Sequence, residues 1–297
     1  MKLNPVYLKD LKLNARSTKF AMIIFIYNLC FGLAITLFMY ARMYRVPGKL
    51  VYNYENCEQL YSFIAGIELC SIFFFVPVLA AGTVCSEREN KTLDFIAVSR
   101  LSPLQFICGK LSYVFTLMFV ILISNLPVNS LITITSSIPL RVQWQLLVLL
   151  MVTSLYVSSI AIYFSTIKRN TFTALMWTYM VIFILTIGTI FIYNLNGYVL
   201  KDMKMQKFNE FKGVYYVFLL NPIATHVYMI SSSKQGLISK WIPAYMESYL
   251  VEFSIFIQLA ISIVLIGLSG LHLDSRTFTE IVPVFQNLKK HKKRKTL

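Results

Sequence analysis

Residues 85–110 read CSERENKTLDFIAVSRLSPLQFICGK, a charged segment that stands between two apolar runs. The flanking runs are Tyr61–Val84 and Leu111–Ile134, and each has the length of roughly 20 residues that a helix needs to cross the hydrocarbon core of a bilayer. A membrane protein that keeps such a charged segment at one surface can use it to contact something soluble. This stretch therefore predicts two membrane spans joined by a connection with a functional role.

Composition extends this prediction to the whole chain. Hydrophobic residues make up 57% of it and charged residues only 14%, with a mean hydropathy of +0.65, and these values exclude an ordinary soluble domain. We expect an all-α membrane protein with a six-helix transmembrane domain over residues 20–273, an N-terminal segment 1–19 and a basic tail 274–297. The six predicted spans are Phe20–Tyr40, Tyr61–Val84, Leu111–Ile134, Trp144–Phe164, Phe172–Tyr193 and Leu250–Leu271.

The distribution of Lys and Arg predicts the orientation of the chain. Basic residues gather in segment 1–19, in the connection after the second run, in the turn after the fourth run and in the tail 274–297. The opposite short loops hold only Arg42, Arg45, Lys49 and Arg141. Because basic loops stay inside, we expect both termini to be cytoplasmic. The net charge of +15 then reflects this bias and attraction to anionic membrane lipids, rather than nucleic-acid binding.

The N-terminal segment predicts a helix that lies on the membrane surface. Asn4 is a capping residue, and Pro5 suits the first helical position. At about 100° per residue, one face of this helix is apolar and the opposite face is basic, as in interfacial helices. The apolar face holds Leu3, Val6, Tyr7 and Leu11, and the basic face holds Lys9, Lys12, Arg16 and Lys19. A plain cytoplasmic extension of the first span is the alternative.

The connection between the second and third spans predicts a helix, a break and a second helix. Glu87 and Lys91 are four residues apart and Lys91 and Asp94 three apart, so with Asn90 they share one predicted helical face. Ser102-Pro103 caps the helix that leads into the third span. On spacing alone, a solvated linker with its own weak ion pairs is an equal alternative.

The same connection resembles a known family. Gly82-Thr83 precedes Ser86–Asp94, and Leu101-Ser102-Pro103 and Gly109-Lys110 follow. This pattern, roughly G-x-x-x-x-E-R-E-x-x-T-L and then L-S-P and G-K, resembles the region between the second and third helices of type-2 ABC exporter permeases, the ABC-2 type transporter family. Asn90-Lys91 stand where many relatives have Arg-Gly, which leaves open a shift of the helix break that the family has there.

The resemblance spans the six-helix plan of the chain, and Asn4-Pro5-Val6 with Lys9-Asp10-Leu11 resembles the family's N-terminal interfacial helix. It implies the permease of a bacterial plasma-membrane exporter, paired with a second permease copy and driven by a separate ABC ATPase subunit that binds ATP and Mg²⁺. A small toxin or antimicrobial peptide is the favoured amphipathic cargo, and lipid or a lipid-linked molecule is the alternative. The residues implied to form the coupling helix, which docks into the ATPase, are Glu87, Arg88, Glu89, Asn90, Lys91, Thr92, Leu93 and Asp94.

Sequence motifs agree with the assignment of ATP binding to a separate subunit. The chain has no G-x-x-x-x-G-K-[ST] loop, so we expect nucleotide to bind the partner and no cofactor to bind here. It has no G-x-S-x-G or H-E-x-x-H motif and no His within the six predicted spans, so we expect no enzymatic activity. A non-transporting scaffold or sensor subunit remains an alternative, because docking of an ATPase does not prove passage of a substrate.

The external segment 194–249 interrupts the simple six-helix plan. Val214–Ile230 is apolar but is broken by Asn221-Pro222 and His226, so it is too short for a confident seventh span. The resemblance implies short or re-entrant helices that cap the outer leaflet. We expect His226 to pack and to form hydrogen bonds rather than to bind metal.

Glu68 is the conspicuous charge within the predicted spans. Carboxylates inside a membrane are costly and usually face the protein interior or a water-filled path. We expect Glu68 to face away from lipid and treat it, with Asn125 and Asn129 of the third span, as a candidate translocation path. A protonated or paired structural glutamate, hydrogen-bonded to Asn125 or Asn129, is the equal alternative.

Overall fold

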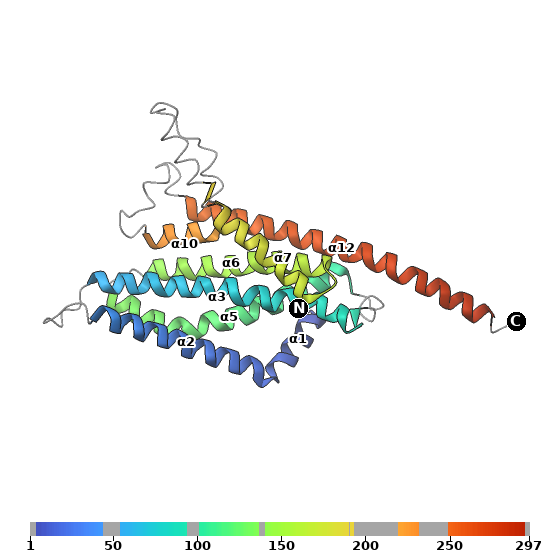
Figure 1. The fold of residues 1–297 in the computed structure, drawn as a ribbon, viewed down its shortest axis with the longest axis horizontal. Coiled ribbons are helices and arrows are strands. Elements are labelled where there is room, and N and C mark those ends of the chain that lie inside the picture. Colours follow the sequence, from blue (N-terminus) through green and yellow to red (C-terminus); the bar gives the residue numbers. More distant parts are fainter. Residues whose placement is uncertain are drawn as a thin grey trace, which may run out of the picture.

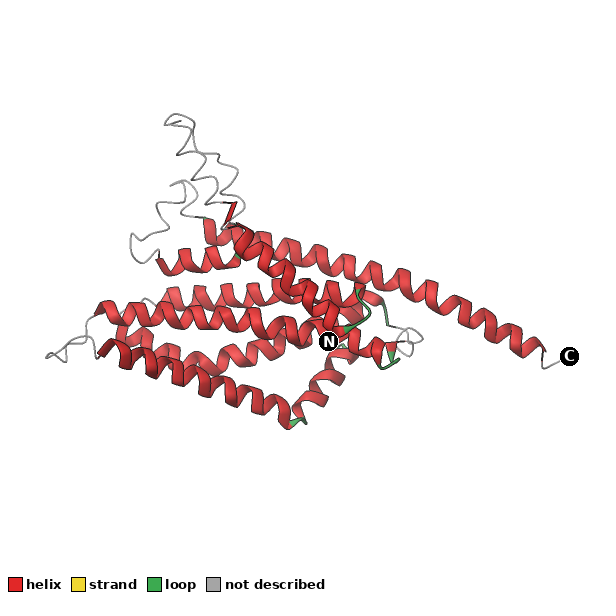
Figure 2. Cartoon of the chain, viewed as in Figure 1, coloured by secondary structure: helices red, strands yellow, loops and turns green. Residues whose placement is uncertain are grey.

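Helices form every regular element in the part of the chain that the computed structural model describes (Figure 2). The described residues are 4–43, 54–93, 101–136, 140–189, 191–192, 219–231 and 249–294. No strand occurs within them, so the predicted all-α class is confirmed. The elements are α1 (Pro5–Ala15), α2 (Thr18–Met43), α3 (Tyr54–Glu89), α5 (Pro103–Ser136), α6 (Leu140–Ile167), α7 (Thr171–Phe183), the π-helix η1 (Ile184–Gly188), α10 (Pro222–Ser231) and α12 (Leu250–Arg294).

Within the described ranges, six helices are long and apolar enough to cross a membrane, so the chain is a multi-pass membrane protein. Five of the predicted spans lie wholly on these helices, several of which continue past the predicted ends. The fifth, predicted as Phe172–Tyr193, is covered by α7 and η1 as far as Gly188, and its predicted end at Tyr193 lies outside the described residues. The last helix continues from the predicted end at Leu271 to Arg294, so the segment predicted as a basic tail begins as helix (Figure 1). The apolar stretches are Phe20–Ala41, Gln59–Glu89, Pro103–Ser130, Leu140–Ile167, Thr171–Gly188 and Leu250–Leu273.

Helix α6 lies at the centre of the bundle, where it packs against α3, α5, α7 and α12 (Figure 1). In an apolar window of 18 residues on α6, 78% of the residues are buried, against 17% in the corresponding window of the peripheral α2. Small buried side chains on α6 include Ser158, Ala161 and Ser165. Small residues let helix backbones approach closely in membranes, where apolar burial between helices gives little driving force.

Three helices begin at a polar residue followed by proline. Asn4 and Asn221 each accept a backbone N–H from the first turn of the helix that follows, α1 and α10 respectively. Ser102 and Gln105 form a reciprocal capping box at the start of α5, with both bonds at 3.3 Å. The predicted caps Asn4-Pro5 and Ser102-Pro103 are therefore confirmed, and the interruption at Asn221-Pro222 is a third helix start.

Helix α10 lies within the predicted external segment. Its 10 residues are too few to cross a bilayer, and it packs against α12 and α6. The remainder of the predicted apolar segment, before Leu219, lies outside the described residues.

Candidate functional site

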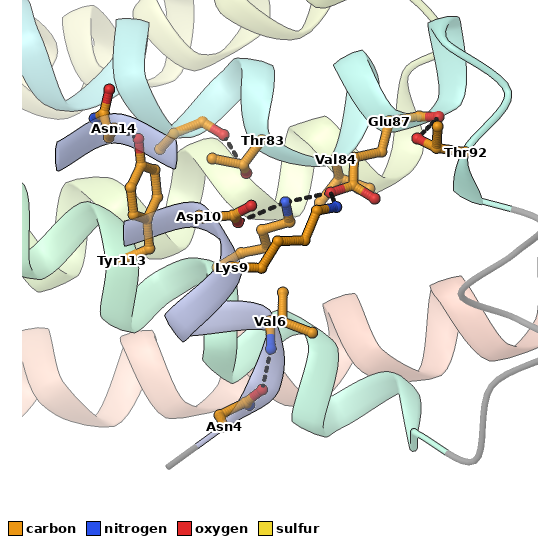
Figure 3. A network of polar contacts seen from close by, with 12 residues as sticks. Asn4, Val6, Lys9, Asp10, Asn14, Thr83, Val84, Glu87, Thr92 and Tyr113 are labelled. Atoms are coloured by element: carbon orange, nitrogen blue, oxygen red, sulfur yellow. Dashed lines mark hydrogen bonds and ion pairs between the residues drawn. The ribbon is translucent and has the colours of Figure 1, made fainter. Parts of the chain in front are cut away.

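One buried ammonium group joins three helices at the end of the bundle that carries α1 (Figure 3). Lys110 Nζ in α5 lies 2.8 Å from Asp10 Oδ2 in α1 and 2.6 Å from Glu87 Oε1 in α3. The Lys110 side chain is only 5% exposed. Lys9 Nζ lies 3.5 Å from Glu87 Oε1, on the side of the carboxylate that faces solvent. We call these four residues, Lys9, Asp10, Glu87 and Lys110, the Lys110 cluster.

Helix α1 reaches the Lys110 cluster because it lies along the first turns of α5. Asn4 Nδ2 donates to Gln105 O at 2.5 Å, and Asn14 Nδ2 donates to Tyr113 Oη at 2.7 Å. Between these contacts, a Cβ placed on Gly109 would lie 3.0 Å from Asn4 Nδ2. Gly109 thus lets α1 approach α5 closely, and Lys110, the next residue, supplies the buried positive charge.

The C-terminal end of α3 forms hydrogen bonds with the turn between α6 and α7. Arg88 donates to Lys168 O at 2.5 Å and to Thr166 O at 3.0 Å, which satisfies carbonyl groups at the C-terminal end of α6. Glu89 Oε1 accepts hydrogen bonds from the N–H and the hydroxyl of Thr171, at 2.8 and 3.0 Å. A carboxylate therefore caps the N-terminus of α7, where the helix dipole favours negative charge.

The helix break after α3 falls at Lys91, whose backbone φ is 56°. Thr92 N–H donates to Glu87 O at 2.8 Å and Lys91 N–H donates to Arg88 O at 3.0 Å, a Schellman motif with Lys91 at the position that glycine usually occupies. The prediction that Glu87 shares one helical face with Asn90 and Lys91 is therefore wrong, because α3 ends before Asn90; Asp94, the fourth predicted member, lies outside the described residues. The break falls at Asn90-Lys91, so the shift away from these residues that the sequence left open does not occur.

A second buried polar cluster lies in the half of the bundle remote from α1. Glu68 is 2% exposed, and its Oε1 accepts from Asn129 Nδ2 at 2.7 Å and from Asn125 Nδ2 at 3.3 Å. Asn125 Nδ2 also donates to Tyr27 Oη at 2.9 Å. These four residues form the Glu68 cluster. The prediction that Glu68 faces away from lipid is confirmed. The alternative offered a bond to Asn125 or Asn129, and the carboxylate accepts from both, whereas a translocation role stays a prediction.

His226 on α10 is buried, with 1% of its surface exposed. Its Nδ1 donates to Pro222 O at 2.7 Å, which is the hydrogen-bonding role predicted for it. Burial removes water from the ring and lowers the pKa of His226 to about 4, although the bond to Pro222 opposes this shift. The ring therefore stays neutral at physiological pH.

Asn221 connects α10 to the π-helix η1. Its Nδ2 donates to Thr186 O at 3.0 Å and to Thr189 Oγ1 at 2.6 Å, while its Oδ1 caps α10. From the sequence alone, Asn221 is predicted only to interrupt an apolar segment. A capping residue placed before proline was the available signal.

The predicted coupling residues thus have different environments. Glu87 belongs to the buried Lys110 cluster, Arg88 and Glu89 bind the α6–α7 turn, and Leu93 is half-buried. The exposed residues beyond α3 are Asn90, Lys91 and Thr92, and Asp94 lies outside the described residues. No model of a known protein family matches the chain, and no curated protein sequence matches it significantly.

Proposed function

We propose that this chain is the membrane-spanning permease of a type-2 ABC exporter, driven by a separate ATPase subunit that docks on the exposed turn after α3. The observation that supports this most strongly is the set of contacts behind that turn. The last residues of α3 join it to α1 and α5 through Glu87, to α6 through Arg88 and to α7 through Glu89. A displacement of the turn would therefore move five helices together, as transmission of nucleotide-driven motion requires.

Docking and transmission are assigned to different residues in this proposal. The exposed Asn90, Lys91 and Thr92 meet the ATPase, together with the segment that continues through Asp94. Glu87 is too buried to meet a partner, at 8% exposure, and serves to transmit force. ATP and Mg²⁺ bind to the ATPase subunit, and this chain has no catalytic role of its own.

Exposed side chains on α1 support its placement at the cytoplasmic surface of a bacterial plasma membrane. Lys9, Lys12 and Arg16 are exposed, and Leu13 is 64% exposed beside them. Basic groups and an apolar side chain on one short helix fit anionic headgroups and the acyl boundary. In this orientation both termini are cytoplasmic, and α10 caps the outer leaflet. A second permease copy completes the path.

The proposed cargo is amphipathic, with a small toxin or antimicrobial peptide favoured over lipid. The middle of the bundle contains the polar cluster around Glu68, and the exposed faces of α2, α7 and α12 carry large apolar side chains. Such a bundle suits a molecule with an apolar part that leaves the lipid phase and a polar part that binds inside. It offers little hydration for a large hydrophilic solute.

Co-purification of the ATPase tests the docking assignment. Lys91→Glu reverses the charge of the exposed turn, and we expect it to reduce the recovered ATPase several-fold. Arg141→Glu makes the same change at an exposed site on the opposite end of the bundle and should leave recovery unchanged. Lys91→Gly removes the charge while favouring the local backbone, so it separates charge from conformation.

Equal recovery of the ATPase with wild type and with Lys91→Glu, or no ATPase in any preparation, would contradict the assignment. Recovery that is unchanged in Lys91→Gly but reduced in Lys91→Glu would mean that the introduced carboxylate repels the partner. ATP hydrolysis in proteoliposomes, with and without cargo, then distinguishes an exporter from a scaffold or sensor subunit.

A further inference from the structure

Glu68 lacks a cationic partner among the residues that the structure describes. The hydrogen bonds that its carboxylate accepts from described residues come from the neutral amides of Asn125 and Asn129, while the ion pairs found in the described ranges all involve Lys9 or Lys110. A buried carboxylate with two neutral donors retains capacity for a positive group, because a carboxylate offers about four lone-pair sites. Its placement inside a membrane protein is expensive unless such a group arrives.

A small cavity lies directly against this carboxylate. Glu68, Asn129 and Tyr61 line its polar side. The Tyr61 hydroxyl is buried and has no hydrogen-bond partner within the described residues. Native proteins pair most buried polar atoms, so an unpartnered hydroxyl beside an unpaired carboxylate indicates a site built for a ligand. A ligand that donates hydrogen bonds and carries a positive charge would satisfy both groups at once.

The size of the cavity restricts this ligand. It offers about 10 Å³ to the centre of a water-sized sphere, which is close to the smallest space that holds one water. A primary ammonium group is about as large as water and carries three donors. A quaternary ammonium or a guanidinium group is larger and does not fit this space.

The lining also indicates the direction of entry. Glu68 and Tyr61 are buried, but Leu126 on α5 and Gln143 and Leu147 on α6 are only half-buried. The cavity therefore approaches the surface between α5 and α6, within the membrane span. Leucine side chains at this opening suit an alkyl chain.

We propose that the Glu68 cavity binds the primary ammonium group of an amphipathic cation, with Glu68 as counter-ion, Tyr61 and Asn129 as hydrogen-bonding groups, and the apolar tail lying along Leu126 and Leu147. This inference rests on the proposed export of amphipathic cargo and names the chemical group by which that cargo is recognised. Its test uses the permease alone, so it does not depend on the ATPase or on transport.

Saturation binding of radiolabelled dodecylammonium to the purified full chain in nanodiscs tests the proposal, with empty nanodiscs subtracted. We expect one saturable site per chain that Glu68→Gln weakens at least tenfold. Glu252→Gln neutralises an exposed carboxylate on α12 and should leave the affinity unchanged. Tyr61→Phe removes only the unpartnered hydroxyl and should weaken binding several-fold, which keeps the test decisive if Glu68→Gln does not fold.

Two competitors define the chemistry of the site. Unlabelled dodecyltrimethylammonium, which has the same charge and tail but a larger head, should compete at least tenfold more weakly than unlabelled dodecylammonium. Sodium chloride should compete no better than choline chloride at equal ionic strength, whereas specific competition by sodium would assign the cavity to an alkali ion and overturn the proposal. Equal affinities of wild type, Glu68→Gln and Tyr61→Phe, or no saturable binding above empty nanodiscs, would also overturn it.

Discussion

At the scale of single residues, we expect the side chain of Lys110 to matter most for both structure and function. Its ammonium group balances Asp10 and Glu87, and Lys9 adds a second positive charge at the solvent edge. Removing one member of a buried ion network costs much more than the intact network contributes, because the remaining charges are left buried and unpaired.

We expect Lys110→Met to destabilise the protein by about 3–5 kcal/mol, measured by thermal or denaturant unfolding in detergent. Lys9→Met is the matched control, since its side chain is 56% exposed, and it should cost less than about 1 kcal/mol. The triple variant Asp10→Asn, Glu87→Gln, Lys110→Met should recover most of the loss. Equal effects of Lys110→Met and Lys9→Met would contradict the account of the cluster.

His226 predicts a pH dependence of stability. Its folded-state pKa of about 4 lies below the ordinary value of about 6.5, so the unfolded chain binds the proton first as pH falls. Stability is therefore full above pH 6.5 and declines between about pH 6.5 and 4, by about 2 kcal/mol at pH 5. Unfolding measured at pH 7 and pH 5 should show this loss in wild type, and His226→Gln should remove that part of it.

At the scale of elements, the packing of α1 on α5 depends on Gly109. A Cβ at this position would lie 3.0 Å from Asn4 Nδ2 and 3.1 Å from Val6 Cβ. Gly109→Val should displace α1 and destabilise the protein by about 1–3 kcal/mol. Gly267→Val on α12 is the control, because nothing lies within 4 Å of its Cβ position. A similar change in unfolding midpoint for both variants would contradict a close contact between α1 and α5.

Much of the element order is predictable from the sequence, because the signals are local. The lengths of the apolar runs predict the six spans, and Asn4-Pro5 and Ser102-Pro103 predict the starts of α1 and α5. The partners of Arg88 and Glu89 are not predictable in this way, because they lie 78 to 82 residues away in the chain. For the helix break, the two sequence arguments disagreed: charge spacing favoured a helical face that runs through Lys91, whereas the resemblance implied a break near Asn90-Lys91 and left its shift open. The helix ends there in a conformation that Lys rarely adopts.

The pairing of Glu68 with Asn125 and Asn129 was predictable for a different reason. Few carboxylate and amide side chains occur inside the predicted spans, and buried polar groups in a membrane pair with one another. The role of Lys110 was not predicted from the sequence. Lys110 lies just before the predicted start of the third span at Leu111, where a basic residue is equally well explained by the orientation of the chain in the membrane.

At the scale of the whole molecule, the two polar clusters lie on the same pair of helices. Helix α3 carries Glu87 near its end and Glu68 about 28 Å away, at 1.5 Å per residue. Helix α5 carries Lys110 near its start and Asn125 and Asn129 further along. A force applied at the turn after α3 would therefore reach the Glu68 cluster along two continuous helices.

The central proposal is that this chain exports an amphipathic cargo with energy from a separate ATPase. The most direct measurement is uptake of a fluorescent cationic amphipathic peptide into inside-out membrane vesicles that contain the chain and its co-purifying ATPase. We predict uptake that requires ATP hydrolysis, is lost in vesicles without the chain and falls several-fold in Lys91→Glu. Uptake that is equal with and without ATP, or with and without the chain, would contradict peptide export, and the same comparison with labelled lipid would then decide whether the chain transports at all.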